Sequence, residues 1–167
     1  MLEPKLILAP IDFSDSSKEA LDVAANIASR YGAELLLFHA VPVMPRLPQN
    51  VSIFEEGNYE RELIKDAETR LDALVAKVGE TGVKARSTVS LANDPAMDIV
   101  RIAEQENVGL LVIATHGMTG WRRLAFGSVA DKVVRTAHCP VLVFRSEAAA
   151  VPAAEGHKQS AAAISAQ

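Results

Sequence analysis

The sequence of 167 residues contains one cysteine, Cys139, and only 5% of its residues are aromatic. A single cysteine excludes an internal disulfide and any metal site built from several thiolates. No apolar run approaches the roughly 20 residues that span a bilayer. The N-terminal segment is not arranged as a signal peptide, because its apolar stretch is short and meets Asp12. We therefore expect a cytoplasmic protein without a membrane partner.

Charge is also limited, since the net charge is −4 and offers no broad basic surface for nucleic acid. The Walker lysine, the GxGxxG fingerprint and the GxSxG nucleophile elbow are all missing. Hydrophobic residues make up 49% of the chain and charged residues 23%, which is typical of a globular protein. With few aromatics, the core must be built from Leu, Ile, Val and Ala.

Short apolar runs alternate along the chain with segments of helical spacing. Strands are predicted at residues 5–11, 34–41, 83–90, 109–115 and 139–145. Helices are predicted at residues 16–31, about 58–80, 95–107 and 128–137. This βαβαβαβαβ order predicts an α/β fold, a single doubly wound parallel sheet of five strands with helices on both faces.

Two segments are predicted to lie outside the regular elements. Residues 42–57 contain three prolines and Gly57 and are predicted to form an irregular surface loop. The domain is expected to occupy residues 1–146. The Ala-rich tail, 147–167, is interrupted by a proline and a glycine and is expected to be disordered.

Two polar features meet at the edge of the sheet where the parallel strands end. Asp12 ends the first strand, and residues 114–129 follow the fourth strand and open the last helix. Gly117, Gly120 and Gly127 let backbone N–H groups approach an anion without a Cβ in the way. A helix N-terminus such as this one favours a bound phosphate. The edge is also where open α/β sheets bind ligands.

Plainer interpretations fit the same residues. Glycines between a strand and a helix are ordinary turn residues, and Ser128 with Asp131 matches a capping box. Asp12 can act as a simple cap at the strand end. His116 invites a role as general base, but packing on the turn is the preferred interpretation. The residues alone leave nucleotide binding open.

The spacing in this loop resembles the nucleotide motif of the universal stress protein family, which is a small residue, two residues, Gly, nine residues and Gly-Ser. Ala114, Gly117 and Gly127-Ser128 match it, with alanine where the family usually has glycine. The segments LILAPIDFSDSS, FHAV, Asp94-Pro95 and HCPVLVFR resemble the family as well. The resemblance covers about residues 3–145.

The resemblance implies the strand order 3-2-1-4-5 and a site for ATP, or for ADP or AMP, with Mg²⁺ on the phosphates. Asp12 and the backbone of Pro10 and Ile11 would face the ribose and adenosine end. Val41 would offer backbone groups to the adenine edge. The ribose and phosphates would be held by residues of the loop and the helix start, with Ala114 opening the motif: Gly117, Gly120, Gly127, Ser128 and Val129.

The resemblance also implies a homodimeric regulatory protein of the stress response with an unidentified protein partner. The fifth strands would pair through Val141, Leu142, Val143 and Phe144. Hydrolysis is expected to be slow at most, because no Ser/His/Asp triad or carboxylate pair stands out. The alternative is a nucleotide-free dimeric interaction module, which Ala114 supports. Nucleotide α-hydrolases and ATP pyrophosphatases share the fold, but their glycine-rich loop after the first strand is missing here.

Overall fold

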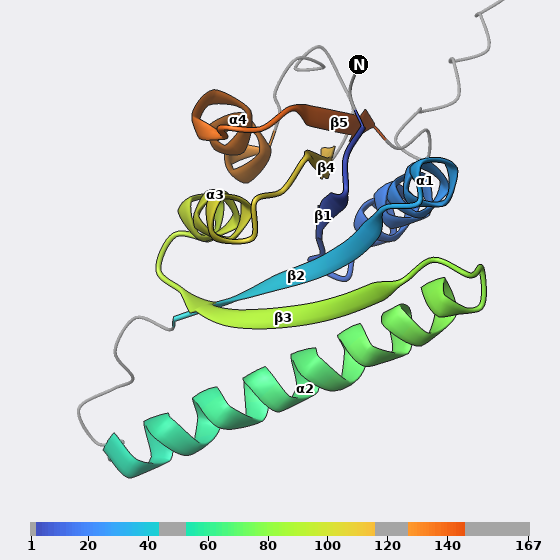
Figure 1. The fold of residues 1–167 in the computed structure, drawn as a ribbon. Helices are drawn as coiled ribbons and strands as arrows, with labels where there is room; N and C mark the ends of the chain where they lie inside the picture. The colour runs from blue at the N-terminus through green and yellow to red at the C-terminus, as the bar shows by residue number, and fades with distance from the viewer. Residues whose placement is uncertain (1–2, 44–52, 116–126, 146–167) are drawn as a thin grey trace, which may run out of the picture.

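The computed structural model describes residues 3–43, 53–115 and 127–145, with the side chains of 53–56 left out. The elements are β1 (Leu6–Pro10), α1 (Asp15–Tyr31), β2 (Glu34–Pro42), α2 (Ile53–Gly79), β3 (Ala85–Ala92), α3 (Pro95–Gln105), β4 (Leu110–Thr115), α4 (Ser128–Thr136) and β5 (Val141–Arg145) (Figure 1). The strands are parallel in the order β3-β2-β1-β4-β5. The predicted fold class and strand order are confirmed. The predicted tail, 147–167, lies outside the described residues.

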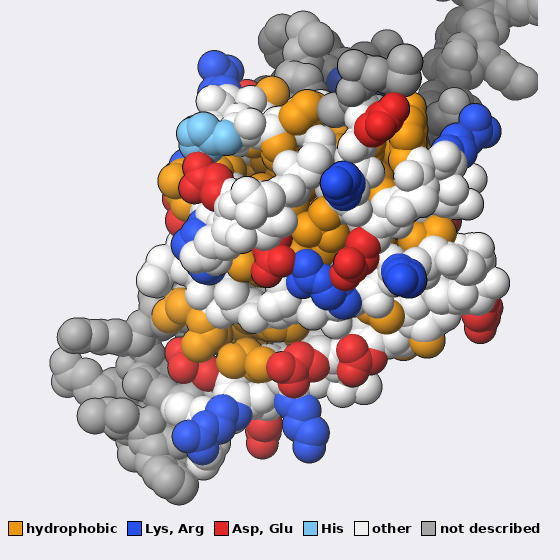
Figure 2. Space-filling model, in the orientation of Figure 1, with side chains coloured by type: hydrophobic (Ala, Val, Ile, Leu, Met, Phe, Trp, Pro, Cys, Tyr) orange, Lys and Arg blue, Asp and Glu red, His pale blue; other side chains and the backbone are white. Residues whose placement is uncertain are grey.

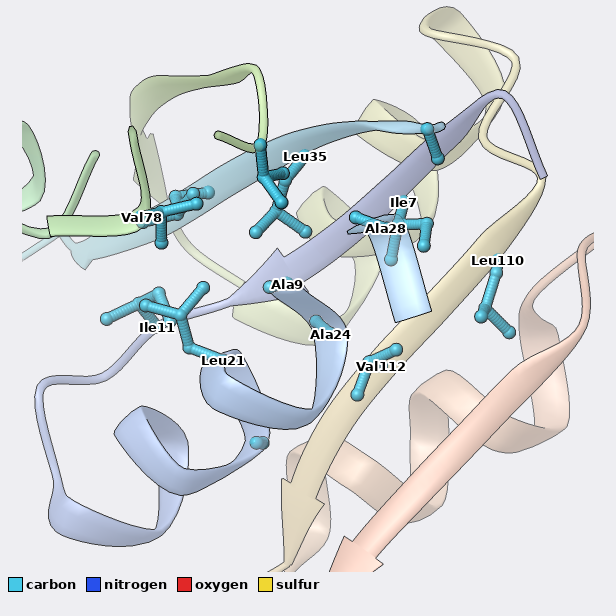
Figure 3. Packing of buried hydrophobic residues seen from close by; sticks show 14 of the residues in the cluster. Ile7, Ala9, Ile11, Leu21, Ala24, Ala28, Leu35, Val78, Leu110 and Val112 are labelled. Carbon is cyan, nitrogen blue, oxygen red and sulfur yellow. The ribbon is translucent and has the colours of Figure 1, made fainter. Parts of the chain in front are cut away.

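The core has two halves because successive residues of each strand point to opposite faces of the sheet. On one face, Ile7 and Ala9 of β1 belong to a buried cluster with residues of α1 and α2. Figure 3 shows this cluster around β1, α1 and β4. On the other face, Leu8 packs with residues of α3 and α4. Both faces are covered, which explains why the central strands are almost entirely apolar.

The helix ends follow the local sequence. The Ser14 hydroxyl caps α1 by accepting a hydrogen bond from the Ser17 N–H at 3.2 Å. Gly32 ends α1 in the left-handed region with φ of 64°, which glycine adopts without strain. The Asp94 carboxylate caps α3 by accepting from the Met97 N–H at 3.3 Å, with Pro95 at the first helical position.

Helix α2 begins at Ile53 instead of near Asn58, and Pro42 is the last residue of β2, so the prediction of an irregular loop over 42–57 is wrong at both of its ends. Residues 44–52 lie outside the described residues. Gly57 favours a loop, but a glycine in a helix costs only about 1 kcal/mol relative to alanine. Packing outweighs that cost, because Ala67, Leu71 and Val78 of α2 are buried against the sheet.

The surface drawn in Figure 2 carries acidic and basic side chains interspersed outside the grey atoms. At one end of the sheet β3 is an edge strand, as its alternating polar residues predict, although it spans Ala85–Ala92 and not 83–90. β5 is the strand at the other end. Among the described residues, no helix is long and apolar enough to span a bilayer.

Candidate functional site

A cavity of about 450 Å³ opens at the carboxyl ends of β1, β2 and β4. The helices α3 and α4 contribute their N-terminal turns to its wall through Pro95 and Ser128. The chain runs outward from β1 to β3 and then returns to β4, so the gap between β1 and β4 is the point where strand order reverses. Open α/β sheets bind ligands at such switch points. The volume lies within the range of about 300–1,000 Å³ typical of ligand pockets.

Most of the residues predicted from the sequence line this cavity. Those that do so are Pro10, Ile11, Asp12, Ala114, Gly127, Ser128 and Val129. Val41 is buried and is not among the lining residues, whereas its neighbours Ala40 and Pro42 are. The predicted residues Gly117 and Gly120, together with His116, lie outside the described residues.

Asp12 leaves the end of β1 and turns the chain into α1. Its Oδ1 accepts hydrogen bonds from the Ser14 N–H at 3.0 Å and from the Ser14 hydroxyl at 2.5 Å. The same hydroxyl caps α1, so the carboxylate, the turn and the helix start form one connected unit. Asp12 is therefore both a cap at the strand end and an exposed carboxylate on the cavity.

The N-terminus of α4 differs from the capping box that the sequence suggested. The N-cap is Gly127, with φ of −53° and ψ of 150°, and as a glycine it has no side chain to cap the helix. Ser128 is the first helical residue and is exposed, and the Asp131 N–H bonds the Gly127 carbonyl. The capping box fails because Ser128 stands one position too late to be the N-cap. Among the residues that the structure describes, no side chain caps the first N–H groups of α4.

Ala114 occupies a regular position in β4, opposite Phe144 of β5. Among the described residues other than glycine, only Phe13 and Asn107 have positive φ. Alanine is strained only where φ is positive, and glycine is therefore not required by the backbone here. Alanine in place of the family's usual glycine is therefore compatible with the backbone of β4.

Several lining residues were missed by the sequence analysis as site residues. They are Ser17, Phe38, His39, Ala40, Pro42, Pro95, Ile99, Ile113 and Ala130. His39 could have been predicted, because it is a polar residue near the carboxyl end of a predicted strand, at the edge of the sheet where ligands bind. For the apolar members no local signal distinguishes a core residue from a cavity wall. His39 is half-buried and its Nδ1 lies 2.6 Å from the Ile11 carbonyl oxygen.

The wall formed by α3 and α4 is joined by a polar contact. Lys132 of α4 donates to Oδ2 of Asp94, the N-cap of α3. This hydrogen bond, with the bond from the Met97 N–H, lowers the pKa of Asp94 below its ordinary value. The contact joins the start of α3 to the middle of α4.

His138 and Cys139, two adjacent residues of types that can bind a metal ion, lie away from the cavity and beside Glu104. His138 pairs through Nδ1 with Glu104 at 2.6 Å, and partial burial raises the pKa of the Cys139 thiol. Cys139 is half-buried rather than buried, and it packs against the cluster under α3 and α4. Within the described ranges no three His, Cys, Asp or Glu side chains gather as a metal site.

The model of the universal stress protein family matches residues 4–145. The chain belongs to this family. It is 40% identical over 144 residues to universal stress protein MJ0531 of Methanocaldococcus jannaschii, covering 84% of this chain and 82% of that protein. The membership confirms the resemblance found in the loop and strand motifs.

Solved structures of the family share the fold. The structure of MJ0577, also from M. jannaschii, matches with a TM-score of 0.72 and 25% identity over 88% of this chain and 99% of that chain. A universal stress protein from Archaeoglobus fulgidus in complex with dAMP matches with a TM-score of 0.56 and 23% identity, covering 86% and 98%. A universal stress protein in complex with cAMP matches at 0.53 and 24%, covering 85% and 97%. The last two likenesses are evidence of the shared fold.

Proposed function

We propose that this universal stress protein binds an adenine nucleotide, ATP with Mg²⁺ in the first place, in the cavity at the switch point. The observation that carries the proposal is that one cavity is lined by two groups suited to different parts of a nucleotide. The carboxylate of Asp12 lies on one wall, and the N-terminus of α4, whose N-cap Gly127 has no side chain, lies on another.

The phosphates would lie at the start of α4. Free N–H groups and the positive end of the helix dipole attract an anion there. Gly127 leaves room at this point, because a Cβ built on it meets no described atom within 4 Å. The Ser128 hydroxyl can donate a further hydrogen bond, and Gly117 and Gly120 remain proposed phosphate contacts. A divalent cation would neutralise the phosphates.

The nucleoside would occupy the other end of the cavity. A carboxylate accepts hydrogen bonds from ribose hydroxyls, which suits Asp12 and the adjoining backbone of Pro10 and Ile11. Apolar side chains such as Phe38, Ile99 and Ile113 give a wall that fits a base. The role of Val41, backbone contact with adenine, stays a prediction. Universal stress proteins that hold dAMP and cAMP support the adenine nucleotide class.

Nucleotide hydrolysis is expected to be slow at most. Of the described residues that line the cavity, Asp12 and His39 are the ones that can act as bases. The Asp12 carboxylate accepts two hydrogen bonds from Ser14, and His39 bonds a backbone carbonyl. Binding without fast turnover suits a cytoplasmic regulatory protein whose nucleotide state biases contact with another protein.

Homodimerisation is proposed through β5. This strand is the last of the described sheet, and Val141, Leu142, Val143 and Phe144 are all half-buried. An edge strand presents backbone N–H and C=O groups that another strand can bond. A second copy of the chain pairing β5 with β5 would satisfy those groups.

The first experiment is mass spectrometry of the denatured pure protein, to identify nucleotide carried through purification. Calorimetry with Mg-ATP, Mg-ADP and AMP then measures binding. We expect at least one adenine nucleotide to bind with a dissociation constant below millimolar. No binding at millimolar concentration would refute the proposal and favour the nucleotide-free dimeric module.

A further inference from the structure

Ile11, the residue before Asp12, is bonded to β2 through both of its backbone polar groups. Its N–H donates to the Phe38 carbonyl at 2.8 Å. Its carbonyl oxygen lies 2.6 Å from Nδ1 of His39. A carbonyl can only accept, so Nδ1 carries the proton and donates it. The Ile11 side chain is buried in the core cluster with Leu21 (Figure 3), and the chain therefore enters Asp12 from a fixed point.

Phe13, the residue after Asp12, is held from two sides. Its φ of 65° lies in the left-handed region, which a bulky side chain adopts only when its surroundings hold it there. The His39 ring of β2 packs against the Phe13 ring at 4.6 Å between centroids, tilted by 43°. On α2, the Arg70 guanidinium carbon lies 3.7 Å from the Phe13 ring centroid, within cation–π distance.

One side chain, His39, thus contacts both neighbours of Asp12. We propose that His39 is a positioning residue, which orients the Asp12 carboxylate toward the nucleotide by fixing the backbone before it and the ring after it. The inference deepens the proposed function and rests on it, because the ligand role of Asp12 is part of that proposal. The hydrogen bonds from Ser14 to Oδ1 complete the orientation.

His39 also lines the cavity, and a direct contact between its Nε2 and the ligand is the competing explanation. Two amide side chains separate the two roles. The amide nitrogen of asparagine is attached to Cγ, as Nδ1 is, and can keep the donation to Ile11. The amide of glutamine reaches the place of Nε2 and can keep a ligand contact there. His39→Leu keeps neither.

The test uses the full chain with His39→Asn, His39→Gln and His39→Leu, titrated with Mg-ATP in a calorimeter. We expect His39→Leu and His39→Gln to weaken binding about tenfold, the equivalent of one lost hydrogen bond of about 1.4 kcal/mol. His39→Asn should bind within about threefold of the native chain. Rescue by glutamine instead of asparagine would overturn the proposal. So would equal weakening in all three variants.

A second readout needs no nucleotide. The amide proton of Ser14, which bonds Asp12, is followed by NMR in the nucleotide-free protein. Its chemical shift should move in His39→Leu and His39→Gln and stay near the native position in His39→Asn. An unmoved Ser14 amide in all variants would refute positioning, even where binding is weakened. If the native chain binds no nucleotide, the proposed function fails while the Ser14 amide still decides whether His39 orders the turn.

Discussion

Lys132 of α4 donates a hydrogen bond to the carboxylate of Asp94, and that carboxylate is at the same time the N-cap of α3. A single side chain therefore stabilises the start of one helix and joins it to the next. The two helices flank the cavity, so this contact matters both for folding and for the shape of the site.

The Asp94–Lys132 contact predicts a pH dependence of stability. Because the pKa of Asp94 is lowered in the folded state, its contribution is fully present above the ordinary aspartate pKa of about 3.9. It is lost as the pH falls below that value, through the folded-state pKa. Asp94→Asn keeps a good N-cap but removes the charge. Urea unfolding should show the native chain more stable than this variant at pH 7, and the difference should shrink at pH 3.

Lys132→Met serves as the control for that measurement, since it removes the partner and leaves the cap. It should reproduce the same loss at pH 7, and combining both substitutions should add little further loss. A stability difference that is equal at pH 7 and pH 3 would contradict the assignment.

Gly127→Leu should separate ligand binding from folding. The φ and ψ of Gly127 are open to any residue, and a Cβ there meets no described atom within 4 Å. The folded chain should therefore lose about 1 kcal/mol or less, the scale of a poorer N-cap. The added side chain would fill the space where phosphates approach α4, and we expect Mg-ATP to bind at least about tenfold more weakly, or about 1.4 kcal/mol.

Gly57→Ala is the matched control, because Gly57 lies in α2 and its added Cβ also meets no described atom within 4 Å. Alanine should stabilise the helix by about 1 kcal/mol and leave the Mg-ATP affinity unchanged. Native affinity in Gly127→Leu would show that the phosphates do not lie at α4.

Gly109→Ala is expected to destabilise the fold. A Cβ on Gly109 would lie 2.9 Å from the Cα of Pro4 and 3.1 Å from its Cβ, and the backbone of the N-terminal segment would have to shift. The Gly109 N–H is bonded to the Leu6 carbonyl at 2.9 Å, which limits that movement. We expect a loss of about 1–3 kcal/mol in the free energy of unfolding, as for other overpacked sites. Denaturation unchanged within error would show that the segment adapts freely.

The proposed dimer predicts opposite effects for two neighbouring residues of β5. The Leu111 N–H donates to the Pro140 carbonyl, and Leu111 lies opposite Val141. In a parallel pair with this register, the N–H of Leu142 points toward β4. The N–H of Val143 then points to the outer edge. Val143→Pro removes only an outward donor, which edge strands tolerate. Light scattering should then show a monomeric mass in place of a dimeric one.

Leu142→Pro is the control, since it removes a donor that faces β4. This variant should lose fold stability by about 3 kcal/mol or more, whatever its oligomeric state. A Val143→Pro chain that stays dimeric would place the interface elsewhere.

The alternation of strands and helices can be predicted from local patterns, because buried parallel strands are mostly apolar and the apolar positions of helices recur with a period of 3.6 residues. The sequence by itself also determined the caps at Ser14, Gly32 and Asp94, where a local side chain or backbone preference is sufficient. The loop motif and Asp12 indicated the family for the same reason, since spacing is a local property, and they predicted the edge of the sheet at which a ligand is proposed to bind.

Contacts between residues far apart in the chain depend on how the elements pack. The start of α2 depended on packing against the sheet, which outweighed the local preference of Gly57. The N-cap of α4 proved to be Gly127 instead of Ser128, a one-residue difference that local propensity does not resolve. The proposed positioning role of His39 depends on its contacts with Ile11 and Phe13, which lie 28 and 26 positions away in the chain. Contacts of this kind follow from the strand order. The periodicity of the sequence predicts strands and helices but does not predict which of them lie side by side.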